Sequence, residues 1–213
     1  MKTIVISAAA AVLFLAAGFP AQANEIFEMY ADSTMDGHAG VLMRTTDNGA
    51  IDATLFLFEE AGMIRAYAER EFGSPTWDIF SDPQFITPAT SISIDDTWRF
   101  LDEQGSETVA TAVAMESITT PAGTFSCYRA DVEIVSDPGT VVSSMWVSSG
   151  IGLVRQMDFF QSSSPAQFDL LSSNLVGGSG FFPLAAGNIW EFTEIILPVE
   201  SSSWGAIKAK YNN

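Results

Sequence analysis

Turn-forming residues interrupt this chain at short, regular intervals, and their spacing constrains the fold more than any other feature of the sequence. Between residues 41 and 160, segments rich in Val, Ile, Thr and aromatic residues are separated by clusters of Gly, Pro, Asn and Asp. This pattern is typical of short strands joined by tight turns. We therefore predict a meander of antiparallel strands. The turn clusters are Asp47-Asn48-Gly49, Glu60-Ala61-Gly62, Gln104-Gly105, Pro121-Ala122-Gly123, Asp137-Pro138-Gly139 and Ser149-Gly150.

Side-chain alternation within these segments supports the prediction. Arg129, Asp131 and Glu133 alternate with apolar or aromatic residues, which gives a strand one buried and one hydrated face. No sustained helical period follows the N-terminal region. We predict an all-β or β-dominated fold, a curved antiparallel meander sheet (half-barrel) with room for a short covering helix. The predicted strands span residues 41–46, 51–58, 63–69, 77–80, 97–102, 107–118, 125–135, 140–147 and 152–160, with one or two more after residue 180.

The first 23 residues have the pattern of a cleavable secretory signal. Lys2 precedes an apolar run from Ile4 to Phe19, which ends before a small-residue triplet, Ala21-Gln22-Ala23. The run is shorter than the roughly 20 residues of a membrane-spanning helix. Cys127, the single cysteine, is far from the cleavage point, so lipid attachment there is not expected. We predict cleavage after Ala23, a periplasmic or secreted protein, and no stable membrane anchor.

The rest of the sequence divides into three parts. Residues 24–160 carry the strand signals and are expected to form one antiparallel β domain. Residues 161–180 are rich in Ser and Gly and predict a linker or loop, with room for one helical turn at Phe168–Leu171. Residues 181–213 are expected to add C-terminal strands that pack on the same domain.

The charge balance argues against a nucleic-acid partner. The chain has 9 Lys and Arg against 26 Asp and Glu, a formal net charge of −17, and its arginines are scattered singly. A phosphate-binding groove needs clustered basic residues. The acidity is expected to serve a hydrated, soluble surface.

The sequence lacks the residues that most catalytic and cofactor chemistry requires. His38 is the only imidazole and Cys127 the only thiol, so neither a Ser-His-Asp arrangement nor a zinc or copper site is expected. Asp32–Gly37 matches part of a calcium loop, but Met43 stands where the closing glutamate would be. No cofactor and no metal are predicted. Cys127 is interpreted as a buried, inert thiol, with an intermolecular disulfide as the alternative.

Two stretches resemble a pattern of exported bacterial proteins. One is FPLAAGNIWEF at residues 182–192, with a degenerate copy, IDDTWRF, at 94–100; the other is TPAGTFSC at 120–127, followed by Trp146 and GIGLVR at 150–155. Together they resemble the lipoprotein-carrier-like (LolA/LolB-like) superfamily of envelope proteins. The resemblance implies a strongly curved antiparallel sheet whose concave face can hold acyl chains. It implies no catalytic residue, because the matching positions are turn and core residues.

Aromatic residues supply the candidate binding site. Trp98 and Phe100 share one face of their strand by parity, and Trp146 lies on a nearby strand. We predict that these three residues and Met157 line a cavity on the concave face. The alternative is that they fill the core.

Three functions remain open from the sequence. The preferred one is a non-catalytic exported protein that binds an apolar or lipid ligand or an envelope protein partner. The second is a structural or adhesion module without a cavity. The third is a carboxylate-based secreted hydrolase, for which the acids adjacent in sequence are Glu59-Glu60 and Asp95-Asp96.

Overall fold

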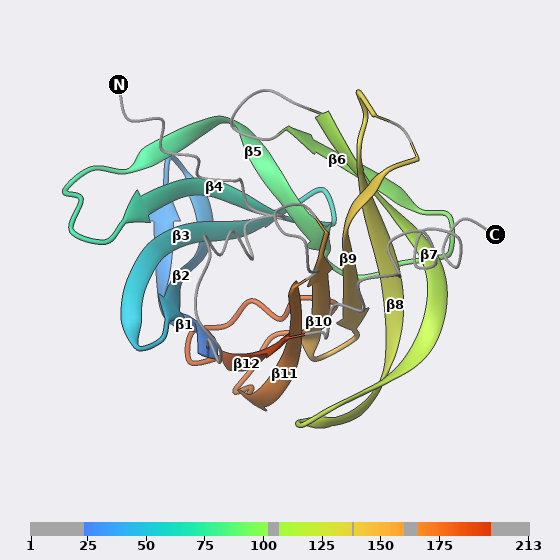
Figure 1. Cartoon of the computed structure of the whole chain (residues 1–213). Helices are drawn as coiled ribbons and strands as arrows, with labels where there is room; N and C mark the ends of the chain where they lie inside the picture. The colour runs from blue at the N-terminus through green and yellow to red at the C-terminus, as the bar shows by residue number, and fades with distance from the viewer. Residues whose placement is uncertain (1–23, 102–106, 138, 160–165, 197–213) are drawn as a thin grey trace.

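The computed structural model describes residues 24–101, 107–137, 139–159 and 166–196, and these form one antiparallel sheet of twelve strands (Figure 1). The described part of the chain contains no helix, and so none that could span a membrane. The all-β prediction is confirmed, without the covering helix that it allowed. The strands are β1 (Asn24–Met35), β2 (His38–Asp47), β3 (Ala50–Glu60), β4 (Met63–Glu71), β5 (Asp78–Pro88), β6 (Thr97–Leu101), β7 (Glu107–Thr120), β8 (Gly123–Ile134), β9 (Val141–Ser148), β10 (Gly152–Asp158), β11 (Ala166–Asn174) and β12 (Ile189–Ile196).

The strand order is that of two meanders joined through the first and last strands. It runs β5-β4-β3-β2-β1-β12-β11-β10-β9-β8-β7-β6, so that β5 and β6 are the edges. The sheet curls until these edge strands approach each other (Figure 1), but it stays open between them. Register shifts, among them those at Met29/Ala31 and Leu153/Arg155, supply the bending that β-bulges give a sheet.

The concave side of the sheet holds the main core, whose buried members come from nearly every strand. On β8 the alternation of polar and apolar side chains predicts the core residues correctly, because Ala130 and Val132 point inward. Its largest fully buried side chains are aromatic, including Trp190, Phe168 and Phe192. The core is therefore a single contiguous filling of the curved sheet.

Two strands extend beyond the residues that the sequence predicts as strand. β1 precedes the first predicted strand, which begins at residue 41, and β2 pairs with it as far as the Asp36-Gly37 turn. β5 runs through Pro83 to Pro88, although prolines predict interruption. An edge strand tolerates proline because one row of its backbone groups needs no partner in the sheet.

The predicted linker at residues 161–180 is wrong over Ala166–Asn174. This stretch forms β11, a central strand between β10 and β12, and not a helical turn. Its inward residues, Phe168 and Leu170, are buried in the main core. Asp169 between them is buried on the other face, and the serines before and at the end of this segment are what gave it the composition of a linker.

A loop at residues 175–188, not the strand expected from residue 181, covers one end of the main core. Asn188, fully buried, organises it: its side-chain oxygen accepts the N–H groups of Val176 (2.8 Å) and Gly177 (3.3 Å), and its amide donates to the carbonyls of Gly177 (2.9 Å) and Pro183 (2.8 Å). Gly180 (φ +83) passes so close to the carbonyl of Ala89 that a Cβ there would lie 1.8 Å from it. Asn188 thereby fixes the turn that leads into the Trp190 strand.

The β7–β8 hairpin bends across neighbouring strands and forms a second layer. Its tip reaches β11, where the N–H of Ala122 donates to the carbonyl of Leu170 at 3.2 Å (Figure 1). Between hairpin and sheet lies a small core, which we call the hairpin cluster. Cys127 is fully buried in it and unpaired, and burial raises the pKa of its thiol to about 11, as expected for an inert cysteine. The hairpin cluster consists of Ile118, Cys127, Trp146 and Val154, with Phe125, Ile151 and Met157 packed against it.

Candidate functional site

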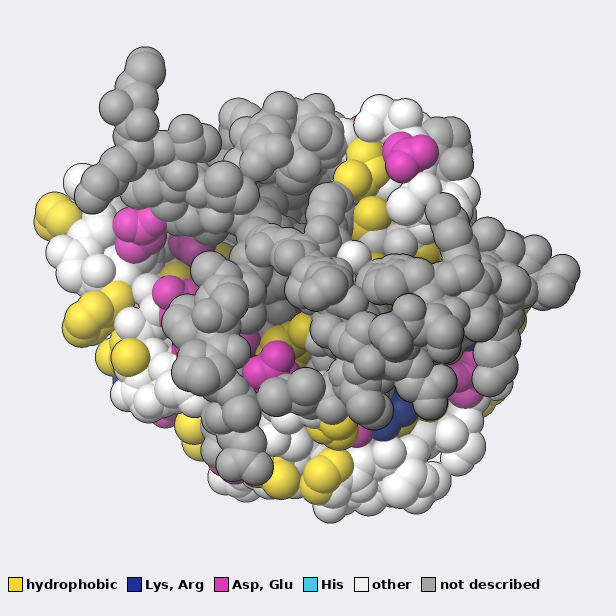
Figure 2. All heavy atoms as spheres, in the orientation of Figure 1, with side chains coloured by type: hydrophobic (Ala, Val, Ile, Leu, Met, Phe, Trp, Pro, Cys, Tyr) yellow, Lys and Arg dark blue, Asp and Glu magenta, His cyan; other side chains and the backbone are white. Residues whose placement is uncertain are grey.

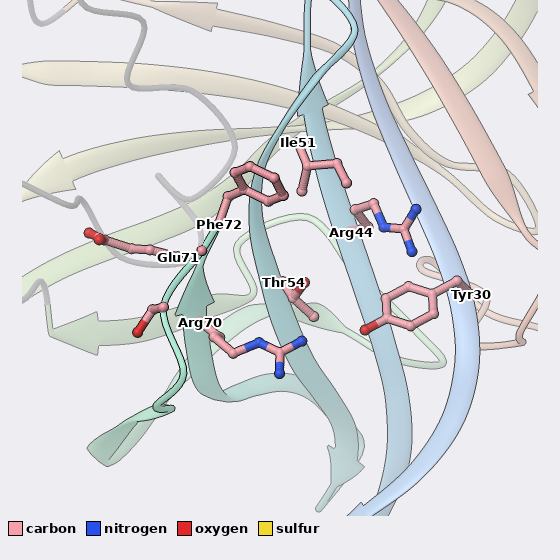
Figure 3. Close-up of a pocket in the computed structure, with 9 residues that line it drawn as sticks. Tyr30, Arg44, Ile51, Thr54, Arg70, Glu71 and Phe72 are labelled. Atoms are coloured by element: carbon pink, nitrogen blue, oxygen red, sulfur yellow. The ribbon is translucent and has the colours of Figure 1, made fainter.

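A cavity of about 270 Å³ opens on the outer face of β1–β4, the face opposite the main core (Figure 3). Direct register pairs place Arg44 beside Thr54, and Thr54 beside Arg70, so these three residues form one row across β2, β3 and β4. Cross-strand neighbours on one face have Cβ atoms about 5 Å apart. Arg44 and Arg70 therefore stand on either side of Thr54, and the Arg44 side chain extends from the row toward Tyr30 on β1 (Figure 3). We call this site the arginine pocket; it is lined by Tyr30, Arg44, Ile51, Thr54, Arg70, Glu71, Phe72, Gly73 and Ser74.

Aromatic rings position both arginines. The Arg44 guanidinium lies 4.6 Å from the centre of the Tyr30 ring, and that of Arg70 lies 4.8 Å from the centre of the Trp77 ring. Stacking of this kind leaves the N–H donors at the edge of the guanidinium free for another partner. Arg44 also approaches Glu28 at 3.6 Å, a long contact between partly exposed groups.

Arg70 carries a positive charge that no carboxylate neutralises within the part of the chain that the structure describes. Glu71 lines the cavity, but its side chain points away from the arginines (Figure 3). The hydroxyl of Tyr30 points toward Thr54 and Arg70 in the same view. The centre of the pocket is thus a cluster of hydrogen-bond donors.

The rim of the pocket is apolar on one side. Phe72 is 70% exposed, the largest exposure among the exposed large hydrophobic residues of the described chain. Its backbone N–H donates to the carbonyl of Asp52 at 2.8 Å, which holds the loop after β4 against β3. Ile51 lies beside it (Figure 3). The pocket therefore joins a cationic centre to an exposed apolar wall.

This arrangement differs from the rest of the surface. The chain has a net charge of −17, and the face in Figure 2 carries acidic side chains (magenta) at several separate places among hydrophobic ones. Two arginines on one row are therefore a local exception. Arg44 and Arg70 cannot be recognised as a pair from the sequence, because each stands alone in the chain and register shifts on β2 and β3 hide their alignment.

The structure separates the residues that the sequence predicts for a cavity. Trp98 belongs to the main core, and its buried Nε1 has no hydrogen-bond partner among the residues that the structure describes. Trp146 and Met157 lie together in the hairpin cluster, on the other face of the sheet. Phe100 belongs to β6, but its side chain lies outside the described residues.

The side chain of Trp146 takes part in a hydrogen-bond network that has a structural role. Its Nε1 donates to Glu116 at 3.0 Å, and the same carboxylate accepts a hydrogen bond from Arg129 at 3.1 Å. Arg129 in turn pairs with Asp131 at 3.2 Å, and the hydroxyl of Ser144 donates to Asp131 at 2.7 Å. The indole is thus satisfied within a network that joins β7, β8 and β9.

Other candidates from the sequence lie in ordinary structural settings. His38 packs against the Phe58 ring, with 4.4 Å between centroids, and Asp36 of the partial calcium loop accepts a hydrogen bond from the Tyr67 hydroxyl at 2.7 Å. The pairs Glu59-Glu60 and Asp95-Asp96 are exposed. Across the described ranges, no group of three or more His, Cys, Asp or Glu side chains is placed to hold a metal ion.

The fold defines an open, curved, all-β sheet protein with a donor-rich pocket on its outer face. One segment is similar to a known family: a family model described as DUF3108-like matches residues 110–163. That segment contains most of β7 and all of β8, β9 and β10, and with them the hairpin cluster. No curated protein and no solved structure matches the chain.

The match covers less than half of the chain and includes the TPAGTFSC and GIGLVR stretches. The LolA/LolB-like relationship stays a prediction. The arginine pocket lies outside the matched segment, so its role is argued from its own geometry.

Proposed function

We propose that this chain is a non-catalytic exported protein that binds an amphiphilic ligand, with the arginine pocket holding the carboxylate of a fatty-acid-like molecule. The observation that carries the proposal is the Arg44–Thr54–Arg70 row beside the exposed ring of Phe72. The signal pattern of the first 23 residues supports a place in the periplasm or the medium.

The chemistry of the row suits a carboxylate. A guanidinium donates two parallel hydrogen bonds to a carboxylate, and hydroxyl groups add further donors. Thr54 is already buried, so little water has to leave that side of the site when a ligand binds. Because no carboxylate in the described part of the chain pairs with Arg70, a bound anion has no ion pair there to displace.

The apolar rim of the pocket suits the hydrocarbon part of the proposed ligand. A phenyl ring that is 70% exposed leaves apolar surface in water, and covering it releases roughly 25 cal/mol per Å². The cavity is slightly smaller than typical small-molecule sites of about 300–1,000 Å³. It therefore accommodates the head of an acyl chain, whose tail lies over Phe72 and Ile51.

Calorimetric titration of the purified protein with decanoate and with decanol tests the proposal. We expect decanoate to bind and decanol to bind about tenfold more weakly, because only the carboxylate uses the arginines. R70Q should lower the affinity for decanoate about tenfold. The matched control is R99Q on β6, which removes an exposed arginine far from the pocket and should leave the affinity unchanged.

A second variant tests the rim. F72S should weaken binding of decanoate more than binding of butanoate, because the shorter chain does not cover the ring. Equal losses in R70Q and R99Q, or no binding of decanoate to the unaltered protein, would reject the arginine pocket as the site and favour a structural module.

A further inference from the structure

The outer end of the β7–β8 hairpin extends past both strands that flank it. β6 pairs with β7 only as far as Thr111, and β9 pairs with β8 only from Tyr128 onward. Residues 114–127 therefore pair only with each other, as a two-stranded ribbon whose outer edges have no strand partner in the described part of the chain. We call this ribbon the flap. It bends away from β6 and β9 toward β11 (Figure 1).

Three changes in the sheet coincide at the base of the flap. The pairing with β6 ends, the pairing with β9 ends, and β7 has a register shift between Ala112 and Ala114. A β-bulge leaves one residue without a direct partner across the ladder and bends the strand. Because neighbouring strands contribute no pairs beyond this point, the ribbon can pivot here without breaking the ladders of the remaining sheet.

The flap has one apolar face and one mainly polar face. Ile118 and Cys127 are buried in the hairpin cluster, and Phe125 packs against it. A two-stranded ribbon on its own is at best marginally stable in water, so the flap depends on this small cluster for its position. The opposite face is exposed and carries mostly hydroxyl groups, those of Ser117, Thr119, Thr124 and Ser126.

Polar contacts fasten the tip of the flap to the sheet. The guanidinium of Arg155 on β10 donates to the carbonyl of Thr119 at 3.2 Å. The N–H of Ala122 donates to the carbonyl of Leu170 on β11, also at 3.2 Å. Arg155 is held in place by its two hydrogen bonds to Asp169. It is therefore a preorganised donor that the flap meets only when it is closed.

The closed position also leaves a buried polar group unsatisfied. Thr120 shares the inner face of the flap with Ile118 and is 6% exposed. Its hydroxyl has no hydrogen-bond partner among the described residues. A buried hydroxyl without a partner regains hydrogen bonds to water when it becomes exposed. Opening therefore recovers part of the free energy that breaking the tip contacts costs.

We propose that the flap opens as a unit about the bulge between Ala112 and Ala114, with Arg155 as its latch, while the rest of the sheet stays folded. Opening uncovers the apolar side chains of Trp146 on β9 and Val154 on β10, which the closed flap keeps from water. The flap thus controls access to an apolar surface on the face opposite the main core. This inference does not depend on the function proposed for the arginine pocket.

Cys127 makes the opening measurable, because it is the only thiol in the chain and is fully buried under the flap. Iodoacetamide labelling at urea concentrations below the unfolding transition, followed by mass spectrometry, reports how often the thiol is exposed. We expect labelling at least about tenfold faster than global unfolding, measured by circular dichroism, allows. The labelling rate should depend little on urea, because opening exposes a small surface. The matched control is V132C in a C127A background, which places a thiol in the main core on the same strand and should be labelled only through global unfolding.

The variant R155K tests the latch. A lysine side chain keeps a positive charge beside Asp169 but lacks the planar fork that also reaches the carbonyl of Thr119. We expect the labelling of Cys127 to accelerate about tenfold beyond what the change in global stability of R155K predicts. R99K, which alters an exposed arginine on β6, is the matched control and should leave the labelling rate unchanged.

Hydrogen exchange of the unaltered protein gives a second measurement that needs no variant. The amides of the flap should exchange together, and about tenfold faster than those of residues 128–134, which continue the same strand. Three outcomes would each overturn the inference: equal exchange in the two segments, equal labelling of the two thiols relative to the global stability of each protein, or equal effects of R155K and R99K.

Discussion

Arg155 and Asp169 join two elements that the sequence leaves unrelated. Arg155 donates to the two carboxylate oxygens of Asp169 at 2.5 and 2.6 Å, and its third contact is the carbonyl of Thr119 at 3.2 Å. Asp169 is only 2% exposed. A single guanidinium thus holds the tip of the β7–β8 hairpin against β10 and β11.

Removing this arginine should destabilise the protein strongly. R155A leaves the Asp169 carboxylate buried without its countercharge, which typically costs about 3–5 kcal/mol. We expect the free energy of unfolding, measured by urea denaturation, to fall by about 3 kcal/mol.

R99A is the matched control. Arg99 forms an exposed ion pair with Glu107, and such pairs contribute about 0–1 kcal/mol. An R155A variant as stable as R99A would show that the pair does not hold the hairpin.

At the scale of elements, the loop at residues 175–188 shows how irregular backbone is stabilised inside a β protein. It has no strand ladder, yet its N–H and carbonyl groups at Val176, Gly177 and Pro183 are satisfied by one side chain, Asn188. Trp190, two residues later, donates its Nε1 to the carbonyl of Ile151 at 2.6 Å. The loop and the β9–β10 turn are thereby fixed as one cover over the main core.

Asn188→Ala should loosen this cover. The substitution removes four hydrogen bonds at a fully buried position and leaves backbone groups without partners, so we expect a loss of roughly 2–4 kcal/mol in the free energy of unfolding. Hydrogen exchange of residues 175–188 should accelerate in the same variant. Asn174→Ala, at an exposed position at the end of β11, is the control and should change stability by less than about 0.5 kcal/mol.

At the scale of the whole molecule, an acidic protein holds two acids that favour their protonated forms. Burial raises the folded-state pKa of Glu25 to about 9 and that of Asp158 to about 6, above the ordinary values of 4.5 and 3.8. The folded state therefore binds more protons than the unfolded state between those limits. The stability that these groups contribute is fully present below the ordinary values and is lost as the pH rises through the folded-state values.

Stability should therefore decline from about pH 4 to pH 9. For Asp158 alone the loss is on the order of 3 kcal/mol, and most of it should occur below pH 7. Unfolding free energies of the unaltered protein and of E25Q/D158N, compared across this range, measure the effect. The variant should have a flatter pH profile, whereas parallel profiles would contradict the prediction.

Local chemistry determined much of this protein. Gly, Pro, Asn and Asp at the turn clusters and side chains with a two-residue period act on near neighbours in the chain. For this reason the sequence predicted an all-β antiparallel sheet, most strand positions and a buried Cys127. The β7–β8 hairpin and the main core are built mostly from residues that are apolar in the sequence.

Tertiary structure alone decided what faces what. β-bulges shift the register between paired strands. For this reason, side-chain parity within a single strand does not show that Trp98 and Trp146 lie on opposite faces of the sheet. It also does not show that Arg44 and Arg70 lie in one row. β11 was predicted as part of a linker because serine residues stand before and at the end of it, and only the tertiary structure pairs its Asp169 with Arg155 of another strand. The arginine pocket comes from the register of the neighbouring strands β2, β3 and β4, which β-bulges shift and which turn residues alone do not predict.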